Sequence, residues 1–536
     1  MRDKILNKER LLGQTIGPVS YTHLTLPTQT IGLTLLMLVS KVLAFGREMI
    51  ISYVYGASAI SDAYNIANSI VVLVFATIAE GVVNAYIPRC TKISDNEERN
   101  RFTNNLINIT MFIMAIVIIV GFLFTEPITD IVGAGFSAET KLYASQILRF
   151  AFVAAACYFI IAIMNGYLNI HKSVGFNGIQ LIIINLCMIV CILLTKGNQQ
   201  QLGIGYMISY LIPTVVVFFL ARKYTYHFRF QINVHDERVA EVYRVALFAI
   251  IGTNVIKLNA MIDKMFASNY PEGSVTALNN GYTIALLVPE IFVMALVTVI
   301  FPRISQAKAD GDENSFYVLL IRGIKTILLL MLPMTILIYT LANPIIAILF
   351  ERGAFTAEDT LLTAKILRGY AVGMIGISLN FLLCRAFMAW KREKLSAVVL
   401  GAGMLCNMIL NAICTQNFAC EGLSISTSVI VTIIAVIFII IFCKAAHGRE
   451  YVQYKENSIF FGKLAIASMI MAFTTKYVNV MVWQNLVMEG LVGSIVKTML
   501  VAVCGMIVYM AVLCMLRVNV LDVLGVSCKS TRSVKG

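Results

Sequence analysis

Residues 136–149 read FSAETKLYASQILR, and residues 355–368 read FTAEDTLLTAKILR. Seven of these fourteen positions are identical, and the serine–threonine and glutamine–lysine pairs are close substitutions. A second pair of segments, IPR at 87–89 and FPR at 301–303, recurs at a nearly equal distance along the chain. Two similar offsets indicate that one structural unit occurs twice in this sequence.

The composition is that of a membrane protein. Of 536 residues, 59% are hydrophobic and 13% are charged. A soluble domain has about 45–50% apolar and about 25% charged residues, and a disordered chain has fewer apolar residues still. Because a membrane-spanning helix needs roughly 20 apolar residues, the chain has room for a dozen or more spans. The sequence therefore predicts an all-α polytopic membrane protein.

Apolar runs bounded by charged residues, Gly and Pro predict fourteen transmembrane helices. Their expected ranges are 29–55, 61–87, 103–124, 141–168, 176–195, 201–221, 240–268, 274–301, 315–342, 357–389, 395–415, 420–443, 458–482 and 490–516.

The repeated segments fall at the same place in the helix count, before helices 4 and 10 and in helices 2 and 8. Helices 1–6 and 7–12 are therefore two copies of one six-helix unit with the same orientation. Two such parallel lobes are typical of transporters with a substrate site at the repeat interface. We expect an N-terminal lobe at 29–235, a C-terminal lobe at 236–448 and two extra helices within 449–516.

Both ends of the chain are predicted to be cytoplasmic. Lys and Arg are concentrated in alternate connections, and the remaining connections carry mostly acidic residues. Cytoplasmic loops carry such an excess, so the formal net charge of +13 reflects orientation rather than nucleic-acid binding. The tails are expected at 1–28 and 517–536. Residues 19–28, VSYTHLTLPT, resemble translated sequencing-adapter sequence more than a natural tail.

The sequence predicts no cofactor and no metal site. The twelve cysteines contain no CxxC pair, and the five histidines never cluster. Buried thiols behave as small hydrophobic groups, so the cysteines are interpreted as packing residues. A Walker A motif does not occur either, which argues against ATP as the energy source. We expect energy from the membrane potential or from a coupling ion that the sequence does not identify.

Charged residues inside the helices are the candidate functional residues. A charge at a helix centre costs at least about 2.5–3.5 kcal/mol, so each one requires a partner, a pocket or a substrate. Cations in the helices that lead each lobe would attract an anionic head group. The candidate substrate-binding cations are Arg47, Lys41, Lys257 and Lys264. The candidate transport-essential carboxylates are Asp62, Glu48, Glu80, Asp263 and Glu290.

Spacing adds three local expectations. Lys257 and Lys264 are two turns apart and share a helix face. Arg47 and Glu48 are adjacent, point about 100° apart and need not pair with each other. Pro289, directly before Glu290, predicts a kink beside that carboxylate.

Four segments carry a resemblance to a known family. They are SKVLAFGRE at 40–48, AEG at 79–81, IDK at 262–264 and LFERGAFT at 349–356, of which the last is the most specific. With them, the chain from about residue 29 onward resembles the MurJ (MviN) family of lipid II flippases. That family is part of the multidrug/oligosaccharidyl-lipid/polysaccharide exporter superfamily.

The resemblance implies a function in peptidoglycan biosynthesis. Family members move an undecaprenyl-pyrophosphate-linked precursor from the inner to the outer leaflet of the bacterial cytoplasmic membrane, by alternating access. The implied partners are this polyprenyl-pyrophosphate-linked glycan and membrane lipids, with the protein as a monomer and without nucleic acid. The resemblance makes Arg47 a pyrophosphate contact, places Lys41 at a family arginine, and matches Asp62 and Glu80 to important family carboxylates.

Two departures leave alternatives open. Phe75 and Ile284 stand where family members usually have arginine, so half of the expected cationic cage is missing. Lys257 and Lys264 could replace it, although a lysine is a point charge rather than a fork. The alternatives are a flippase for another polyprenyl-linked polysaccharide, of capsule or teichuronic type, and a drug/cation antiporter. A membrane enzyme would need larger aqueous loops or a clustered catalytic constellation.

Overall fold

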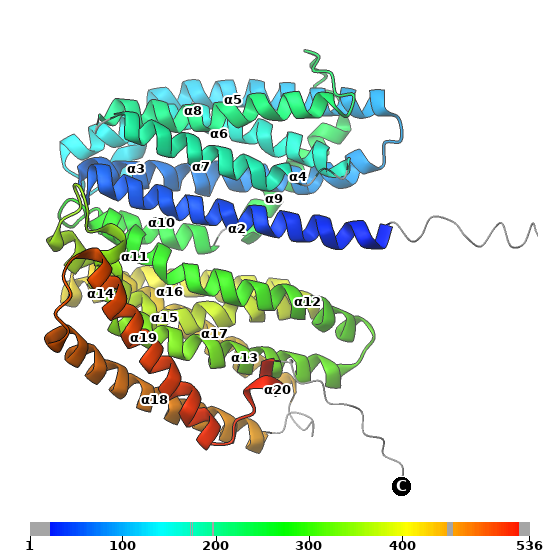
Figure 1. Ribbon diagram of the computed structural model, residues 1–536. Helices are drawn as coiled ribbons and strands as arrows, with labels where there is room; N and C mark the ends of the chain where they lie inside the picture. Colours follow the sequence, from blue (N-terminus) through cyan, green and yellow to red (C-terminus); the bar gives the residue numbers. More distant parts are fainter. Residues whose placement is uncertain are drawn as a thin grey trace, which may run out of the picture. The chain divides into compact units, whose positions relative to one another are not determined.

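The computed structural model describes residues 22–171, 173, 175–195, 198–253, 255–446 and 454–524. Every regular element within these ranges is a helix (Figure 1), which confirms the all-α prediction. The chain divides into two compact units. Unit 1 consists of Met1–Ile50, Val74–Leu123 and Leu148–Ile250, and unit 2 of Ile51–Leu73, Phe124–Ile147 and Ile251–Gly536.

The helices of unit 1 come from the first half of the chain. They are most of α2 (Thr22–Tyr55), α4 (Thr77–Thr91), most of α5 (Asn96–Val132) and of α6 (Ala138–Ile170), α7 (Phe176–Thr195), α8 (Gln199–Arg222) and most of α9 (Glu237–Thr253). Helix α2 begins at Thr22, seven residues before the predicted start at 29, because a helix can continue past the apolar stretch that reveals it.

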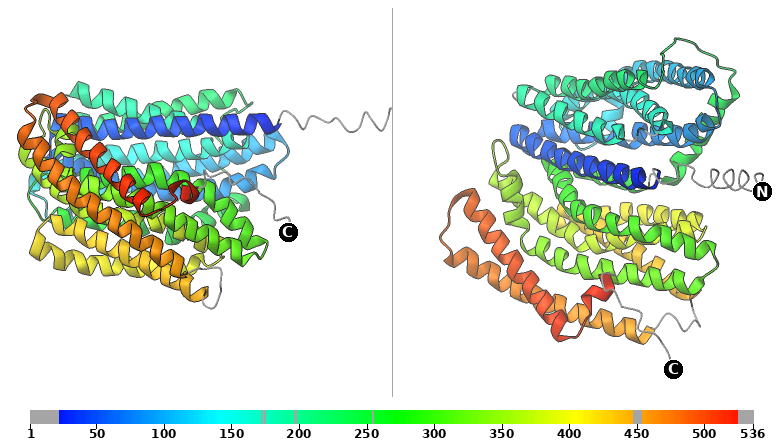
Figure 2. Two further views of the ribbon diagram at one scale, coloured as in Figure 1. Left: turned by 60° about the horizontal axis from the view of Figure 1, so that its bottom comes forward. Right: turned by 45° about the vertical axis from the view of Figure 1, so that its right-hand side comes forward.

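Unit 2 combines a short early helix with the second half of the chain. It contains α3 (Ala59–Ile70), α10 (Val255–Ala267), α11 (Ser274–Val288), α12 (Met294–Ala309), α13 (Glu313–Thr340), α14 (Ala342–Phe350), α15 (Ala357–Ala389), α16 (Glu393–Phe418), α17 (Glu421–Ala445), α18 (Tyr454–Asn485), α19 (Gly490–Met515) and α20 (Val520–Leu524). The predicted extra helices are α18 and α19, which run side by side (Figures 1 and 2). Leu464 and Met471 of α18 and Val501 of α19 join one apolar core with Leu329 and Leu337 of α13.

Twelve helices in the described part of the chain are long and apolar enough to cross a membrane. They correspond to predicted helices 2–6 and 8–14. Predicted helix 1 matches α2, and predicted helix 7 matches the pair α9 and α10. The chain is thus a multi-pass membrane protein; the count of fourteen is compatible with this result and stays a prediction, as do the lobe boundaries.

The repeated sequence segments are helix starts. Helices α6 and α15 are both 33 residues long and begin at equivalent positions, Ala138 and Ala357. The Thr356 hydroxyl accepts a hydrogen bond from the Asp359 N–H (3.3 Å), and the Thr356 N–H donates to the Asp359 carboxylate (2.8 Å). Ser137 likewise accepts from the Thr140 N–H (3.2 Å). The duplicated S/T-A-E pattern is therefore an N-terminal cap, which satisfies N–H groups that the helix leaves open.

Helices 2 and 8 of the prediction each contain a π-helical turn. These turns are η1 (Val71–Ala76), between α3 and α4, and η2 (Pro289–Val293), between α11 and α12. Pro289 lacks an N–H and disrupts the α-helical ladder, so the irregularity predicted there takes this form. The sequence of η1 is apolar and contains no proline, so it did not predict an irregular turn at this position. π turns are rare and often adjoin functional sites, and here they adjoin the candidate carboxylates Glu80 and Glu290.

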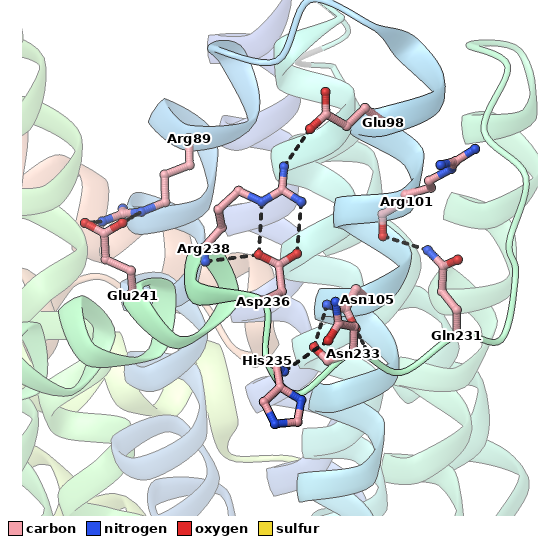
Figure 3. A network of polar contacts seen from close by, with 10 residues as sticks. All are labelled: Arg89, Glu98, Arg101, Asn105, Gln231, Asn233, His235, Asp236, Arg238 and Glu241. Atoms are coloured by element: carbon pink, nitrogen blue, oxygen red, sulfur yellow. Dashed lines mark hydrogen bonds and ion pairs between the residues drawn. The ribbon is translucent and has the colours of Figure 1, made fainter.

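A polar network fastens the segment between α8 and α9 to α5 (Figure 3). Asn105 donates to the Asn233 carbonyl (3.0 Å) and accepts from its N–H (2.7 Å). At the start of α9, the Arg238 guanidinium binds both oxygens of Asp236 (3.0 Å each) and reaches Glu98 at 2.9 Å. The extended segment thus obtains the hydrogen bonds that a helix would make internally.

This network predicts an acid-sensitive contribution to stability. Hydrogen bonding from Arg238 holds the pKa of the Asp236 carboxyl below its ordinary value of 3.8. A carboxylate with a lowered pKa stabilises the fold above its unfolded pKa, and this stabilisation is lost as the pH falls through the folded pKa. We expect Asp236→Asn to melt below the wild type at neutral pH, and by a smaller margin at an acidic pH below the ordinary carboxyl value of 3.8. Thermal melts at both pH values check this; a difference that is no smaller in acid would contradict it.

Candidate functional site

The nine predicted site residues divide between the two units. Unit 1 contains Lys41, Arg47, Glu48 and Glu80. Unit 2 contains Asp62, Lys257, Asp263, Lys264 and Glu290. Each group is therefore described within its own unit.

In unit 1, the charged end of α2 is an ion pair. The Arg47 guanidinium donates to the Glu48 carboxylate at 2.7 Å, although adjacent helical positions do not require such a contact. Glu48 is 8% exposed and Arg47 is half-buried, whereas Lys41 is exposed. A guanidinium with five donors retains capacity for a second anion while it neutralises Glu48. Glu80 lies on α4, exposed at the edge of a polar cavity.

In unit 2, Asp62 of α3 caps the start of α11. Its buried carboxylate accepts hydrogen bonds from the Gly273 N–H (2.8 Å), the Thr276 N–H (2.7 Å) and the Thr276 hydroxyl (2.6 Å). A carboxylate at a helix N-terminus satisfies open N–H groups and interacts favourably with the helix dipole. Asp62 thus joins two helices that lie more than 200 residues apart in sequence.

Gly273 makes this close approach possible. Its φ is +91°, and a Cβ atom there would lie 2.5 Å from the Ala57 carbonyl oxygen. Only glycine fits both the left-handed backbone and the space. Further polar contacts extend the joint, with Asn280 of α11 donating to the Ser52 hydroxyl of α2 (2.9 Å).

Asp263 of α10 is the second buried carboxylate of unit 2. It is 2% exposed and accepts hydrogen bonds from Asn407 Nδ2 (3.0 Å), Asn411 Nδ2 (2.7 Å) and the Thr427 hydroxyl (2.7 Å). The side-chain oxygen of Asn407 is also buried and has no hydrogen-bond partner. An anionic carboxylate beside an unused amide oxygen is a site that can take up a proton or a small cation.

Lys264, the neighbour of Asp263, holds α10 against two other helices. Its ammonium donates to the Ser69 hydroxyl of α3 and to Asn279 Oδ1 of α11, both at 2.9 Å. Lys257 shares its helix and is half-buried, as is Glu290 in η2. Within unit 2, the structure therefore connects Asp62 and Lys264 through the α3–α11 contact, and Asp263 directly precedes Lys264 on α10.

The two positions with missing arginines are part of the apolar packing. Phe75 is 6% exposed and meets the Phe152 ring edge-on, with 5.7 Å between ring centroids. Ile284 is 5% exposed on α11. Both positions are therefore occupied by buried apolar side chains.

Introducing arginine at Phe75 is expected to destabilise unit 1 rather than to improve transport. A buried guanidinium would replace an aromatic pair, at a cost of at least about 2.5–3.5 kcal/mol. Phe75→Leu keeps the site apolar and is expected to cost less than about 1.5 kcal/mol. Melting temperatures in detergent check this. If Phe75→Arg melts at the wild-type temperature, the site has room for a charge and our interpretation is wrong.

Sequence reasoning missed the neutral partners of the buried carboxylates. Asn407, Asn411 and Thr427 lie in apolar helices, and the four-residue spacing of the two asparagines places them on one helix face. Polar side chains at such a spacing inside apolar runs were the available signal. Thr276 carried no signal, because its role depends on a tertiary contact with Asp62.

Comparisons with known proteins identify the family of this chain. The family model described as lipid II flippase MurJ matches residues 51–514. The probable lipid II flippase MurJ of Vibrio cholerae serotype O1 is 23% identical over 513 residues, which cover 90% of this chain and 95% of that protein. The lipid II flippase MurJ of Thermosipho africanus is 25% identical over 422 residues, which cover 78% and 86%.

Solved structures show the same fold. A lipid II flippase MurJ in an inward closed conformation matches with a TM-score of 0.75 and 24% identity, covering 90% of this chain and 98% of that one. An inward-facing multidrug resistance MATE family transporter of the MOP superfamily matches with a TM-score of 0.62 and 12% identity, covering 79% and 99%. Because the family model spans most of the chain, this protein belongs to the lipid II flippase MurJ family, a family of transporters rather than enzymes.

Proposed function

We propose that this protein moves lipid II, the undecaprenyl-pyrophosphate-linked precursor of peptidoglycan, from the inner to the outer leaflet. The observation that carries the proposal is the family match over residues 51–514. The charged residues retained within apolar helices support it, because a transported pyrophosphate needs cations inside the membrane.

Arg47 is the residue best suited to bind the pyrophosphate. Its guanidinium is fixed by Glu48 at 2.7 Å, so it is presented in a defined orientation. Lys41 adds an exposed positive charge on the same helix. Lys257 and Lys264 are the cations of unit 2 that would meet the head group when the transporter alternates between inward- and outward-open states. We also propose that both termini are cytoplasmic, because Lys and Arg are concentrated in the loops that this orientation puts inside.

Asp263 is proposed as the coupling site. Its carboxylate and the Asn407 side-chain oxygen are both buried, and within the described part of the chain that amide oxygen has no hydrogen-bond partner and the carboxylate has no ion-pair partner. Binding of a proton or a sodium ion there would cancel the buried charge. It would also alter the hydrogen bonds that join α10 to α16 and α17.

Asp263→Asn tests this proposal. We expect the wild type in vesicles to respond to a sodium gradient or a pH gradient, and the variant to bind lipid II normally but to respond to neither. Asp312→Asn is the matched control, because Asp312 is an exposed carboxylate at the start of α13. An Asp263→Asn protein that keeps the wild-type gradient response would refute the assignment.

The proposed function is tested by complementation. Cells depleted of their own lipid II flippase should resume growth when this chain is present in their membrane. Absence of rescue by membrane-inserted protein would favour a flippase for a different polyprenyl-linked glycan. The apolar residues Phe75 and Ile284 are the specific observation behind that second candidate.

A further inference from the structure

Unit 1 contains a polar cavity that the pyrophosphate contacts do not explain. Its volume is about 360 Å³, and three membrane-spanning helices line it. Its lining residues are Glu80, Val83 and Asn84 of α4, Tyr158, Ala162, Asn165 and Asn169 of α6, and Asn177 and Gln180 of α7.

The polar residues converge from one face of each helix. Asn165 and Asn169 are four residues apart on α6, and Asn177 and Gln180 are three apart on α7. The side-chain amide of Asn165 donates to Gln180 Oε1 at 2.7 Å, and the side-chain amide of Asn177 donates to Asn169 Oδ1 at 3.0 Å. Asn165 is 7% exposed, and its own side-chain oxygen has no hydrogen-bond partner among the residues that the structure describes. A buried acceptor without a hydrogen bond destabilises the fold, unless a bound ligand donates a hydrogen bond to it.

The internal repeat shows that the fold does not require these amides. Helix α15 matches α6 in length, and its Cys384 and Met388 stand where α6 has Asn165 and Asn169. Likewise Thr298 of α12 is the counterpart of Asn84 in α4. The counterpart positions of Asn84, Asn165 and Asn169 thus carry an apolar or smaller side chain, so the repeated sequence does not require these three amides.

The chemistry of the cavity selects a neutral ligand rich in hydroxyl and amide groups. Asparagine and glutamine side chains both donate and accept, as hydroxyl and acetamido groups do, and the Glu80 carboxylate accepts from hydroxyls. Among the described residues that line the cavity, none is a cation, so a phosphate would be repelled by Glu80. The Tyr158 ring adds an apolar surface beside these polar groups.

We propose that this cavity binds the N-acetylated sugars of the lipid-linked head group, separately from the cations that bind its pyrophosphate. The proposal rests on the proposed function and assigns a part of its substrate to named residues. The cavity lies where α6 ends and α7 begins, beside a connection predicted to be cytoplasmic, which is the side from which the head group would enter.

The test compares three lipids on the purified full-length protein: undecaprenyl pyrophosphate, the same lipid with the disaccharide, and the same lipid with disaccharide and peptide. Asn165→Cys combined with Asn169→Met introduces the residues of the repeat partner, and Asn84→Thr does so at an exposed position. Asn380→Ile is the matched control. It replaces an amide of α15, which donates to the Val431 carbonyl (2.9 Å), with the α6 counterpart Ile161.

We expect the double variant to bind both disaccharide lipids about tenfold or more weakly, and the sugar-free lipid within about twofold of wild type. Asn84→Thr should shift binding in the same direction, and Asn380→Ile should not. Equal weakening for all three lipids, weakening only for the peptide-bearing lipid, or no change would overturn the sugar site. A wild type that fails to bind the disaccharide lipids would instead refute the proposed function itself.

Discussion

Asp62→Ala is expected to abolish transport. The substitution leaves the buried N–H groups of Gly273 and Thr276 without their acceptor and removes a negative charge from the start of α11, while the Thr276 hydroxyl keeps the Ser61 hydroxyl as an acceptor. Losing charge-assisted hydrogen bonds in a buried site costs at least about 3 kcal/mol. Because these bonds join α3 to α11, we expect both the melting temperature and complementation of a flippase-depleted strain to fall.

A matched control separates this joint from ordinary helix capping. The exposed Asp312 accepts from the Ser315 N–H (3.0 Å) at the start of α13, so Asp312→Ala removes the same kind of cap. It should cost about 1 kcal/mol and leave growth intact. Asp62→Asn keeps an acceptor oxygen and should be intermediate. If Asp62→Ala complements as well as Asp312→Ala, the α3–α11 joint is not needed for transport.

Arg47→Ala is expected to remove activity without unfolding the protein. The substitution deletes the proposed pyrophosphate contact and leaves the Glu48 carboxylate, 8% exposed, without its guanidinium partner. Truncating one partner of a buried charge pair across a binding interface costs about 2–5 kcal/mol of binding free energy, and the proposed contact between Arg47 and the pyrophosphate is such a pair. We therefore expect affinity for the pyrophosphate lipid to fall about 100-fold and complementation to fail.

Two further variants identify the cause of this loss. Lys463→Ala removes a cation from α18 outside the proposed site and should behave as wild type. Arg47→Ala combined with Glu48→Gln removes the uncompensated charge without restoring a phosphate ligand. If this double variant regains transport, Arg47 serves only to neutralise Glu48. If Arg47→Ala and Lys463→Ala have equal effects, our assignment of Arg47 to the substrate site and of Lys463 to the periphery is wrong.

The helical architecture was predictable because apolar length and local capping determine it. The duplicated segments at 136–149 and 355–368 indicated two equivalent helices, and the structure gives α6 and α15 with the same length and the same kind of N-terminal cap. Pro289 likewise predicted a kink, and the structure has the π-helical turn η2 at that position. The turn η1 was not predictable, because its sequence, VVLVFA, is compatible with a regular helix.

The candidate site was predictable as a set of charges but not as a set of contacts. Buried carboxylates are recognisable in apolar helices, whereas their partners depend on which helices meet. Asp62 accepts a hydrogen bond from Thr276, and Asp263 accepts one from Asn411. Both contacts join residues more than 140 positions apart in the sequence. Neutral amides carry no penalty large enough to single them out, which is why the cavity of unit 1 was not foreseen.

The most direct test of the central claim is lipid II translocation by the purified protein. Vesicles are prepared with lipid II on both leaflets, and the fraction of head groups open to a membrane-impermeant reagent is followed with time. We predict that the protected fraction becomes accessible in vesicles with the wild type, and remains protected with Arg47→Ala and in protein-free vesicles. Protection that persists with correctly folded wild-type protein, under both a sodium and a pH gradient, would contradict the account.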